Sequence, residues 1–378
     1  MSIDRPLDNS HLMSLKPSIV HVANTNFEFE LGSSSPLEAS FAQSWSKHPL
    51  CLQLQYLPIL AAYPQDLIAV TAAPGADYIK TLEKTGWWPQ GLPQFVPLEE
   101  TSIFIGKKCL SWGSSLQVKE WAEKRQMDYS IPPWEVVKLV NSKAFSFRYQ
   151  TIQEAALIEN ETQLVDWLQE VEGTKVLKTC YGLSGKGNWI VHGQSVTMPI
   201  LKHCRSEWNQ RRPIIGEPWV DRVYDFSTQW HIHPGKDIEW IGATRFKTND
   251  RGKYEGTYAG PENLLFDTLE PFLEEHRKFV QKPLEDMAAL GYFGFVGCDA
   301  LIYRNPSNPS LTLYPLVEIN ARQTMSLMAL RLQQRLFPDS VIHLAFHQPD
   351  TKLISLLPME CADSKGRIIH CRQKLCPI

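Results

Sequence analysis

The segment from Gly291 to Arg331 constrains the fold of this chain more than any other stretch. Two apolar runs within it, Phe295 to Arg304 and Leu311 to Ile319, have the composition of largely buried strands. The residues between them, Asn305 to Ser310, are all Asn, Pro or Ser, which interrupt strands. The segment therefore predicts a β-hairpin, followed by a helix.

Folding this hairpin about its loop places Asp299 opposite Leu316 to Glu318, and side-chain alternation points Glu318 and Asn320 to one face. Three oxygen-bearing side chains then converge, and such hard ligands suit Mg²⁺, which is often shared with nucleotide phosphates. Arg322 follows closely, with a planar donor fork suited to a carboxylate or phosphate. Alternatively, Asp299 and Glu318 end their strands near the surface and are solvated, as most acidic residues are.

Length and composition narrow the class of protein. With 378 residues the chain can form two or three subdomains, and its 43% hydrophobic and 21% charged residues are ordinary for a soluble globular protein. A net charge of -3 argues against a nucleic-acid-binding surface.

The start, MSIDRPLDNS, lacks the basic and apolar runs of a signal peptide, and no apolar stretch approaches the ~20 residues of a membrane span. Eight scattered cysteines without a Cys-x-x-Cys pair favour reduced thiols. We expect a cytoplasmic protein that acts on small molecules, with neither a nucleic-acid nor a membrane partner.

Residues 1–140 alternate short apolar runs with polar helical stretches, a pattern typical of α/β structure. Ser114, with Gln117 three residues later, can cap a helix that ends before Pro132-Pro133. The turn at Trp112-Gly113-Ser114 is compatible with a ligand-binding turn, or with a packing Trp beside a turn glycine.

From Val140 the pattern changes. A helix capped by Asn160 and ended by Gly173 is followed by a strand bearing Lys178 and then by a glycine-rich loop. The loop contains Gly182, Ser184, Gly185, Lys186 and Gly187. Its glycines let backbone N–H groups approach an anion, and Lys186 adds charge. Because a glycine follows Lys186 and a strand follows the loop, it is neither a Walker P-loop nor a Rossmann turn. It remains either a hairpin that folds over phosphates or a plain flexible hairpin.

The segment Glu217-Pro218-Trp219-Val220 lies between two expected strands. Pro218 cannot donate a hydrogen bond in a sheet, so pairing is interrupted there. Such an interruption can bind an adenine edge through Pro218 and Val220, or it can be a simple bulge.

A second hairpin, turned at Asn249 to Gly252, places Arg245 and Lys247 on one face, where they meet an anionic substrate or solvent. The stretch from Pro271 to Leu290 predicts a helix that is broken near Pro283 and ended by Gly291.

Two histidine pairs lack the context of a zinc site. His343 and His347 have helical i, i+4 spacing, and His231 and His233 lie on an expected strand. Neither pair has an obvious third ligand in the sequence, which favours packing histidines over zinc ligands.

Taken in chain order, these motifs resemble those of the ATP-grasp superfamily, which includes D-alanine:D-alanine ligase, biotin carboxylase and carbamoyl phosphate synthetase. The resemblance covers residues 140–331, and the order of the motifs is more specific than any one of them. The preceding part is similar to the α/β domain found before the grasp in many members. The resemblance implies a mixed α/β (α+β) ATP-grasp fold, in which two lobes clamp ATP. The motifs that carry it are Lys143, Lys178, the glycine loop, Glu217 to Val220, Asp299 and Glu318-Ile319-Asn320.

The resemblance also implies roles in binding the nucleotide. Lys143 and Lys178 contact phosphates, and Lys178 also lies near adenine. Ser184, Gly185, Lys186 and Gly187 form the lid. The adenine and ribose contacts come from Glu217, Pro218, Val220 and Asp225, although Asp225 is one residue further from Glu217 than the common spacing.

The resemblance also implies a second set of residues, which bind the metal ion and carry out the chemistry. Asp299, Glu318 and Asn320 hold Mg²⁺, or Mn²⁺ in its place. Arg322 matches the Arg of a Glu-x-Asn-x-Arg pattern that serves an anionic substrate, and Arg245 and Lys186 complete the expected catalytic residues. Gly297 stands where ligases often have an Arg.

We expect four regions: an α/β domain over 1–140, a small lobe over 141–220, a large lobe over 221–335 and a C-terminal extension over 336–378. The implied activity is an ATP-dependent ligase that joins a carboxylate to an amine, of the peptide- or amino-acid-ligating type. An acyl phosphate would be the intermediate, and ADP and phosphate the products. A carboxylase, a kinase-like phosphotransferase and a non-catalytic nucleotide-binding module are the alternatives. A homodimer is compatible with this class.

Overall fold

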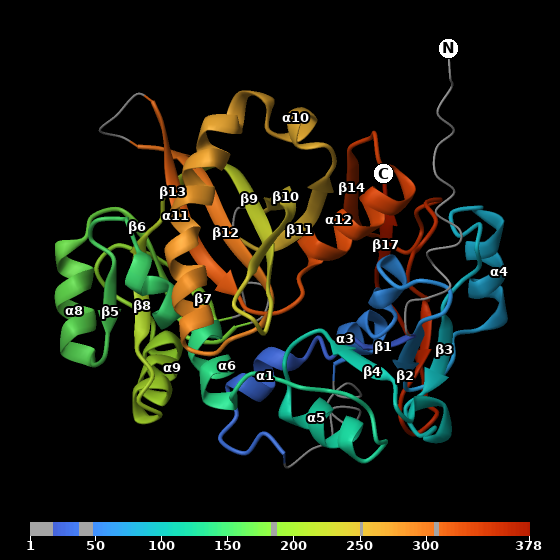
Figure 1. The fold of residues 1–378 in the computed structure, drawn as a ribbon. Coiled ribbons are helices and arrows are strands. Elements are labelled where there is room, and N and C mark those ends of the chain that lie inside the picture. Colours follow the sequence, from blue (N-terminus) through green and yellow to red (C-terminus); the bar gives the residue numbers. More distant parts are fainter. Residues whose placement is uncertain (1–17, 38–47, 183–186, 250–251, 306–309) are drawn as a thin grey trace.

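The computed structural model describes residues 18–37, 48–182, 187–249, 252–305 and 310–378. The chain begins with a four-stranded parallel sheet of order β3-β2-β1-β4, at the lower right of Figure 1. Its central strands are almost fully buried, as expected of a parallel sheet covered on both faces. The expected α/β character of this region is confirmed. The strands are β1 (Ile19–Val22), β2 (Leu67–Val70), β3 (Gln94–Pro97) and β4 (Lys108–Ser111).

Short helices connect these strands and lead into the next sheet. The α-helices are α1 (Phe27–Leu31), α3 (Pro49–Leu54), α4 (Ala76–Lys84), α5 (Leu116–Glu123), α6 (Trp134–Asn141) and α7 (Lys143–Ser146). The 3-10 helices are η3 (Leu57–Leu60), η4 (Ser102–Phe104) and η5 (Phe147–Tyr149).

Helix α5 begins one residue later than the sequence predicts. Ser115, not Ser114, is its N-cap, because Ser115 has extended backbone angles and its Oγ accepts a hydrogen bond of 3.1 Å from the Val118 N–H. The same hydroxyl donates to Glu30, whose other oxygen accepts the N–H of Leu116 at 2.8 Å. A buried carboxylate from α1 therefore completes the cap.

The second sheet is antiparallel, has the order β5-β8-β6-β7 and lies at the left of Figure 1 with α8 and α9. The expected cap of α8 is confirmed, because Asn160 Oδ1 accepts the Gln163 N–H at 3.0 Å. We call this unit the small lobe. Its elements are β5 (Ala156–Ile158), α8 (Glu161–Glu170), β6 (Thr174–Thr179), β7 (Asn188–His192), α9 (Met198–Asn209) and β8 (Ile214–Pro218).

The third sheet has seven strands in the order β13-β12-β9-β10-β11-β14-β17, and its pairings are antiparallel. We call it, with α10, α11 and α12, the large lobe. Its strands are β9 (Asp221–Ile232), β10 (Ile238–Thr248), β11 (Tyr254–Ala259), β12 (Gly294–Arg304), β13 (Leu311–Asn320), β14 (Ile342–His347) and β17 (Lys374–Pro377). The helices are α10 (Glu262–Leu265), η6 (Asp267–Leu269), α11 (Glu270–Ala289) and α12 (Met325–Leu336), and a separate small hairpin pairs β15 (Glu360–Ala362) with β16 (Ile368–His370).

The hairpin expected within residues 291–331 is present as β12 and β13, with Asp299 directly opposite Glu318. Strands β14 and β17 come from the expected C-terminal extension and add to the far edge of the same sheet. His343 and His347 therefore lie on a strand, and the expected helical spacing is wrong for them. Every fourth residue also shares a face in a strand, so the spacing alone did not distinguish the two structures.

Helix α11 continues through Pro283, so the expected break is wrong. One proline removes a single backbone hydrogen bond, and the long buried face of α11 outweighs this loss. Val280, Leu284 and Met287 pack into a core with Trp230 of β9 and Val296 of β12. The helix ends as predicted at Gly291, whose φ is +92°.

The two faces of the large sheet have different roles. Phe226 and Thr228 of β9 face α11, since Phe226 packs near Leu273 and Thr228 bonds His276. The alternate residues Ser227 and Gln229 face the other side, where α12 lies. We call this second side the site face.

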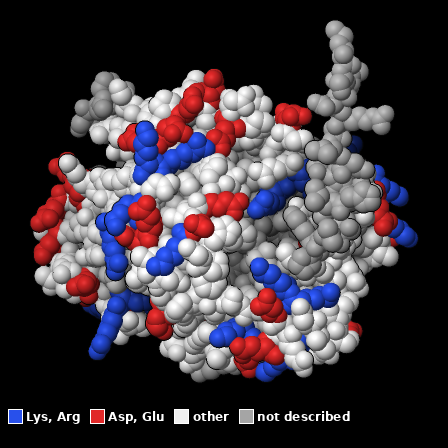
Figure 2. Space-filling view, viewed as in Figure 1, with Lys and Arg blue, Asp and Glu red and all other residues white. Residues whose placement is uncertain are grey.

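The largest apolar core joins the first sheet to α12 and the C-terminal strands. Val20 and Ile68 share it with Leu327, Leu344 and Leu375. Figure 1 shows the corresponding blue and red segments side by side. On the face shown in Figure 2, positive and negative side chains are interspersed. None of the helices described is long and apolar enough to cross a membrane.

Candidate active site

The three predicted metal ligands meet on the β12–β13 hairpin, away from its loop. Asp299 and Glu318 are cross-strand neighbours, and Asn320 Nδ2 donates to Asp299 Oδ2 at 3.0 Å. The other carboxylate oxygen, Asp299 Oδ1, accepts a hydrogen bond of 2.6 Å from Ser227 Oγ on the adjacent strand β9. Two carboxylates and an amide are thus held on the site face by three neighbouring strands.

The pKa values of the two carboxylates are shifted in opposite directions. Burial, followed by the neighbouring charge of Glu318, raises the pKa of Asp299 to about 7. Burial would also raise the pKa of Glu318, but Lys143, and then Arg322 and Lys178, outweigh it and lower that pKa. Glu318 is therefore ionised at neutral pH, while Asp299 shares a low-dielectric site with a like charge.

These donors fit a hard divalent cation. All are oxygen-bearing, and two are carboxylates. Burial, and then repulsion from Glu318, raises the pKa of Asp299, and a cation between the two carboxylates would offset both effects. Asp299, Glu318 and Asn320 would hold Mg²⁺ here and leave positions for water and phosphate oxygens.

Both predicted phosphate-binding lysines lie beside this group, each paired with a carboxylate. Lys143 Nζ donates to Glu318 Oε1 at 2.7 Å, and Lys178 Nζ donates to Glu217 Oε2 at 2.5 Å. The second oxygen of Glu217 accepts a hydrogen bond of 3.3 Å from the Tyr314 hydroxyl. Since Glu217 is in the small lobe and Tyr314 is on β13, this bond crosses between the lobes.

A small pocket, with free room of about 10 Å³, lies between the two lobes at this position. That is room for about one water molecule, far below the roughly 300–1,000 Å³ of typical ligand sites. Its lysines are still engaged with Glu217 and Glu318, so a larger ligand has to separate these pairs. The lining residues are Lys143, Ser146, Phe147, Lys178, Ile215, Glu217, Tyr314, Leu316 and Val317.

The expected adenine contacts fall on the connection between the lobes. Strand β8 ends at Pro218 and β9 begins at Asp221, so only Trp219 and Val220 join the two sheets. Of the expected lid, Ser184, Gly185 and Lys186 lie outside the described residues. Gly187, the last residue of the expected lid, has a φ of +90°, and a Cβ there would lie 2.5 Å from Thr179 Oγ1, so this position has to be glycine.

Asp225 lies on the site face of β9, two residues before Ser227. Its Oδ2 accepts a hydrogen bond of 2.9 Å from Thr248 Oγ1, and Arg222 lies 3.7 Å from its Oδ1. Asp225 is thus engaged by protein partners on the side of the sheet that faces the cavity.

The structure does not bring Arg245 to this group. Arg245 pairs across β9 with Phe226, so its side chain lies on the α11 side of the sheet, over the Tyr224 ring at 4.6 Å. Asp299 lies on the other side. Alternation along β10 could have indicated this, but only if the register between β9 and β10 had been known.

Arg322 connects the group of Asp299, Glu318 and Asn320, which we call the metal-ligand group, to helix α1 in the first domain of the chain (the four-stranded parallel sheet and its helices). Its Nη2 donates to Asn320 Oδ1 at 2.9 Å, and its Nε lies 2.5 Å from Glu28 Oε1 on α1. The guanidinium also lies 5.9 Å from the Trp112 ring centroid. The turn at Trp112 therefore adjoins the site, and the Trp112 side chain is buried in the largest apolar core, as the packing interpretation predicts.

Three contributors were not predicted from the sequence: Ser227, Tyr314 and Glu28. Ser227 could have been found by alternation from Asp225, because both lie on one strand. Tyr314 and Glu28 carry no local signal, since each meets its partner only through the packing of separate sheets.

No protein-family model and no curated protein matches the sequence. Among solved structures, the chain is similar to an N5-carboxyaminoimidazole synthetase from Staphylococcus aureus, with 10% identity and a TM-score of 0.49 over 96% of this chain and 93% of that one. It is also similar to a biotin carboxylase–βγ-ATP complex from Campylobacter jejuni, with 12% identity and a TM-score of 0.48 over 92% of this chain and 79% of that one. A third similar structure is the biotin carboxylase domain of the Hydrogenobacter thermophilus 2-oxoglutarate carboxylase with MgADP, ADP and bicarbonate. Its identity is 12% and its TM-score 0.44, over 68% of this chain and 65% of that one.

Proposed function

We propose that this protein is an ATP-grasp enzyme that binds MgATP between its two lobes and uses it to join a carboxylate to an amine. One observation carries the proposal: the cavity between the lobes is lined by Lys143, Lys178 and Glu217, and Lys143 bonds directly to Glu318 of the metal-ligand group. A site for phosphates and a site for a divalent cation are therefore adjacent.

The ion pairs of the ligand-free state are the physical basis of nucleotide binding. Lys143 and Lys178 are held close to their carboxylates, and phosphate oxygens can replace those carboxylates with charge-assisted bonds of the same kind. Glu217, released from Lys178, can then accept an adenine amino hydrogen beside the Pro218–Val220 connection. Mg²⁺ held by Asp299, Glu318 and Asn320 would neutralise phosphate charge.

The reaction follows from positioning and charge neutralisation. A substrate carboxylate oxygen attacks the γ-phosphorus, the bond to the β-phosphate oxygen breaks, and ADP leaves. The amine nitrogen then attacks the acyl carbon, loses a proton and expels phosphate. We assign binding of the attacking anion to Arg322, because its planar guanidinium lies beside Asn320 and the anion can replace Glu28 as its carboxylate partner.

A carboxylase is the second candidate. The observation that favours it is the Glu318-x-Asn320-x-Arg322 series, which resembles that of the carboxylase-like members and whose Arg pairs with Glu28 beside Asn320. In that case bicarbonate would be the carboxylate that is phosphorylated.

A phosphate-release screen tests both. The purified protein with MgATP is given amino acids in pairs, and bicarbonate with single amines, and ADP, AMP and phosphate are measured. We expect ADP and phosphate that depend on both substrates. The bicarbonate arm identifies the carboxylase, phosphate retained on the acceptor identifies a kinase, and AMP as the product would refute the acyl-phosphate chemistry.

Oxygen-18 in the carboxylate tests the intermediate. Attack by a labelled oxygen carries one label into the released phosphate when the amine displaces it. Amine-dependent label in phosphate supports the ligase, and unlabelled phosphate with normal turnover would exclude the acyl phosphate.

A further inference from the structure

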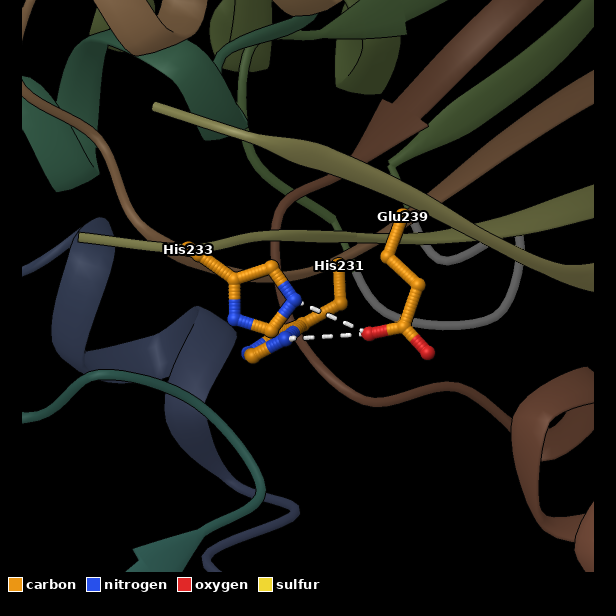
Figure 3. A group of neighbouring side chains, drawn as sticks. All are labelled: His231, His233 and Glu239. Atoms are coloured by element: carbon orange, nitrogen blue, oxygen red, sulfur yellow. Dashed lines mark hydrogen bonds and ion pairs between the residues drawn. The ribbon is translucent and has the colours of Figure 1, made fainter. Parts of the chain in front are cut away.

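The two histidines that the sequence assigns to packing form a compact group with a carboxylate at the end of the β9–β10 hairpin (Figure 3). His231 on β9 is the direct cross-strand partner of Glu239 on β10, and His233 follows two residues after His231. The turn between the strands is closed by the His233 N–H, which donates to the Asp237 carbonyl at 2.8 Å.

The ligand atoms of this group converge. His233 Nε2 lies 2.9 Å and His231 Nδ1 3.9 Å from Glu239 Oε2, and one ligand atom from each residue lies within 4.8 Å of the others. Zinc ligands bind at about 2.0–2.2 Å from the ion. Small side-chain rotations would therefore place the three atoms around one ion. Within the described residues, this is the only such group of three or more His, Cys, Asp and Glu side chains.

The imidazoles are partly ordered by packing yet open to solvent. The His231 ring packs against Phe295 of β12, with centroids 4.6 Å apart, and against the His233 ring at 4.3 Å. The side chains of His231, His233 and Glu239 are 26%, 43% and 56% exposed. The rings of His231 and His233 are thus held by packing, while Glu239, the most exposed of the three side chains, can move to admit an ion.

The donor set separates this group from the magnesium site. His231 lies on the site face of β9, four residues after Ser227. The group therefore lies roughly 13 Å along the strand from Ser227, which bonds Asp299. Two imidazole nitrogens and one carboxylate oxygen suit Zn²⁺ and similar transition metals, whereas the hard oxygen set at Asp299 suits Mg²⁺.

We propose that His231, His233 and Glu239 bind a divalent transition metal ion, with Zn²⁺ the best fit, and leave one coordination position open to water. The ion cross-links the end of the β9–β10 hairpin. This site is independent of the proposed ligase activity.

Zinc binding to the full chain tests the proposal. Zn²⁺ is titrated against a chromogenic chelator with Mg²⁺ in excess, so that the oxygen site is occupied. We expect one tight equivalent in the wild type. Loss of a second-shell partner alone costs roughly 10- to 100-fold in metal affinity. His231→Gln, His233→Gln and Glu239→Gln should each weaken binding by at least that much.

His370→Gln is the matched control, because His370 lies 3.1 Å from Glu360 but, among the described residues, belongs to no group of three metal-ligating side chains. It should leave zinc affinity unchanged. Zn²⁺ should also raise the melting temperature of the wild type and of His370→Gln, but not of Glu239→Gln, whose exposed site preserves folding.

X-ray absorption at the zinc edge distinguishes this site from thiols such as Cys361 and Cys371, whose sulfurs lie 3.6 Å apart. Nitrogen and oxygen ligands at about 2.0–2.2 Å support the proposal. Sulfur ligation, equal affinities in the wild type and the histidine variants, or a hydrogen-bonded His–Glu pair that takes up no zinc would overturn it.

Discussion

Glu318 is the residue at which the proposed metal and phosphate sites meet. Its carboxylate is opposite Asp299 and bonds Lys143, and it lies at the end of a strand where it contributes little to the core. Glu318→Gln keeps the shape but removes the charge. We expect it to lower ATP turnover by at least about 100-fold, as much as losing a second-shell metal partner can cost, with an unchanged circular dichroism spectrum. Glu360→Gln, at an exposed glutamate, is the control; near-normal turnover of Glu318→Gln at saturating MgATP would sink the assignment.

Arg322 supplies geometry as well as charge. Its separate nitrogens engage Asn320, Glu28 and the Gln323 carbonyl, and a lysine cannot span all three. We predict that Arg322→Lys loses roughly 10- to 100-fold in kcat/KM, the equivalent of one charge-assisted bond, while its affinity for ADP is retained. Arg304→Lys, at an exposed pair with Asp221, should have wild-type kinetics. A fully active Arg322→Lys enzyme would show that no forked contact is required.

At this scale the sequence predicted the residues that share one hairpin. Asp299, Glu318 and Asn320 are set by alternation and by one short loop, which are local properties. Glu28 was not predicted, because α1 and Arg322 meet only after the first domain packs on the large lobe. Arg245 was assigned to the site because its face of β10 depends on a register that no local pattern defines.

The cap of α5 gives a test at the level of one element. Ser115 Oγ accepts the Val118 N–H, and the side chain is fully buried. Ser115→Ala should lower the free energy of unfolding by about 1 kcal/mol, the usual cost of losing an N-cap. Ser114→Ala, one residue earlier, should have little effect in the same urea titration. A larger loss of stability in Ser114→Ala than in Ser115→Ala would instead support Ser114 as the N-cap, as the sequence predicts.

Helix α11 carries a buried histidine that makes stability depend on pH. His276 Nδ1–H donates to the Pro315 carbonyl at 2.7 Å, and Nε2 accepts from Thr228 Oγ1 at 2.6 Å, so the ring has to be neutral. Burial, opposed by the Pro315 bond and aided by Arg277, lowers its pKa from 6.5 to about 4. Between these values the unfolded chain binds more protons than the folded one, so stability is complete above 6.5 and falls as pH drops toward 4.

We expect His276 to contribute on the order of 3 kcal/mol to this loss, from the cost of one pKa unit. Urea unfolding of the wild type and of His276→Gln from pH 4 to 7 measures the difference in slope. The variant should be less stable at neutral pH and should show a flatter pH dependence. Exposed His370→Gln should keep the wild-type slope, and equal slopes in His276→Gln and wild type would contradict the prediction.

Elements with a clear local signal were predicted, and those decided by packing were not. The cap at Asn160 and the stop at Gly291 follow from hydrogen-bonding and backbone preferences that act within a few residues. Pro283 misled the prediction because Val280, Leu284 and Met287 bury a continuous helix face around it. The strand of His343 and His347 is held by pairing with β11 and β17, and both partners are distant in the sequence.

At the scale of the whole molecule, Lys143 joins the two lobes. Its backbone N–H donates to the Cys180 carbonyl at the end of the small-lobe strand β6, and its ammonium group bonds Glu318 of the large lobe. The order of motifs along the chain predicted that Lys143 and Glu318 belong to one site. It did not predict that they bond each other in the absence of ligand, because that contact depends on how α7 sits between the sheets.

This bond predicts opposite effects of one substitution on two ligands. Without nucleotide, Lys143 competes with Mg²⁺ for Glu318, so Lys143→Gln should tighten Mg²⁺ binding several-fold. With nucleotide, Lys143 is proposed to bind phosphate, so the same change should weaken ADP binding in the absence of Mg²⁺ by roughly 1.5–3 kcal/mol. Calorimetric titration of each ligand separately measures both effects. Lys138→Gln, at a surface pair with Glu135, should change neither. If Lys143→Gln weakened both ligands, or neither, then Lys143 would not exchange Glu318 for phosphate, and the adjacency of the two sites would have no energetic consequence.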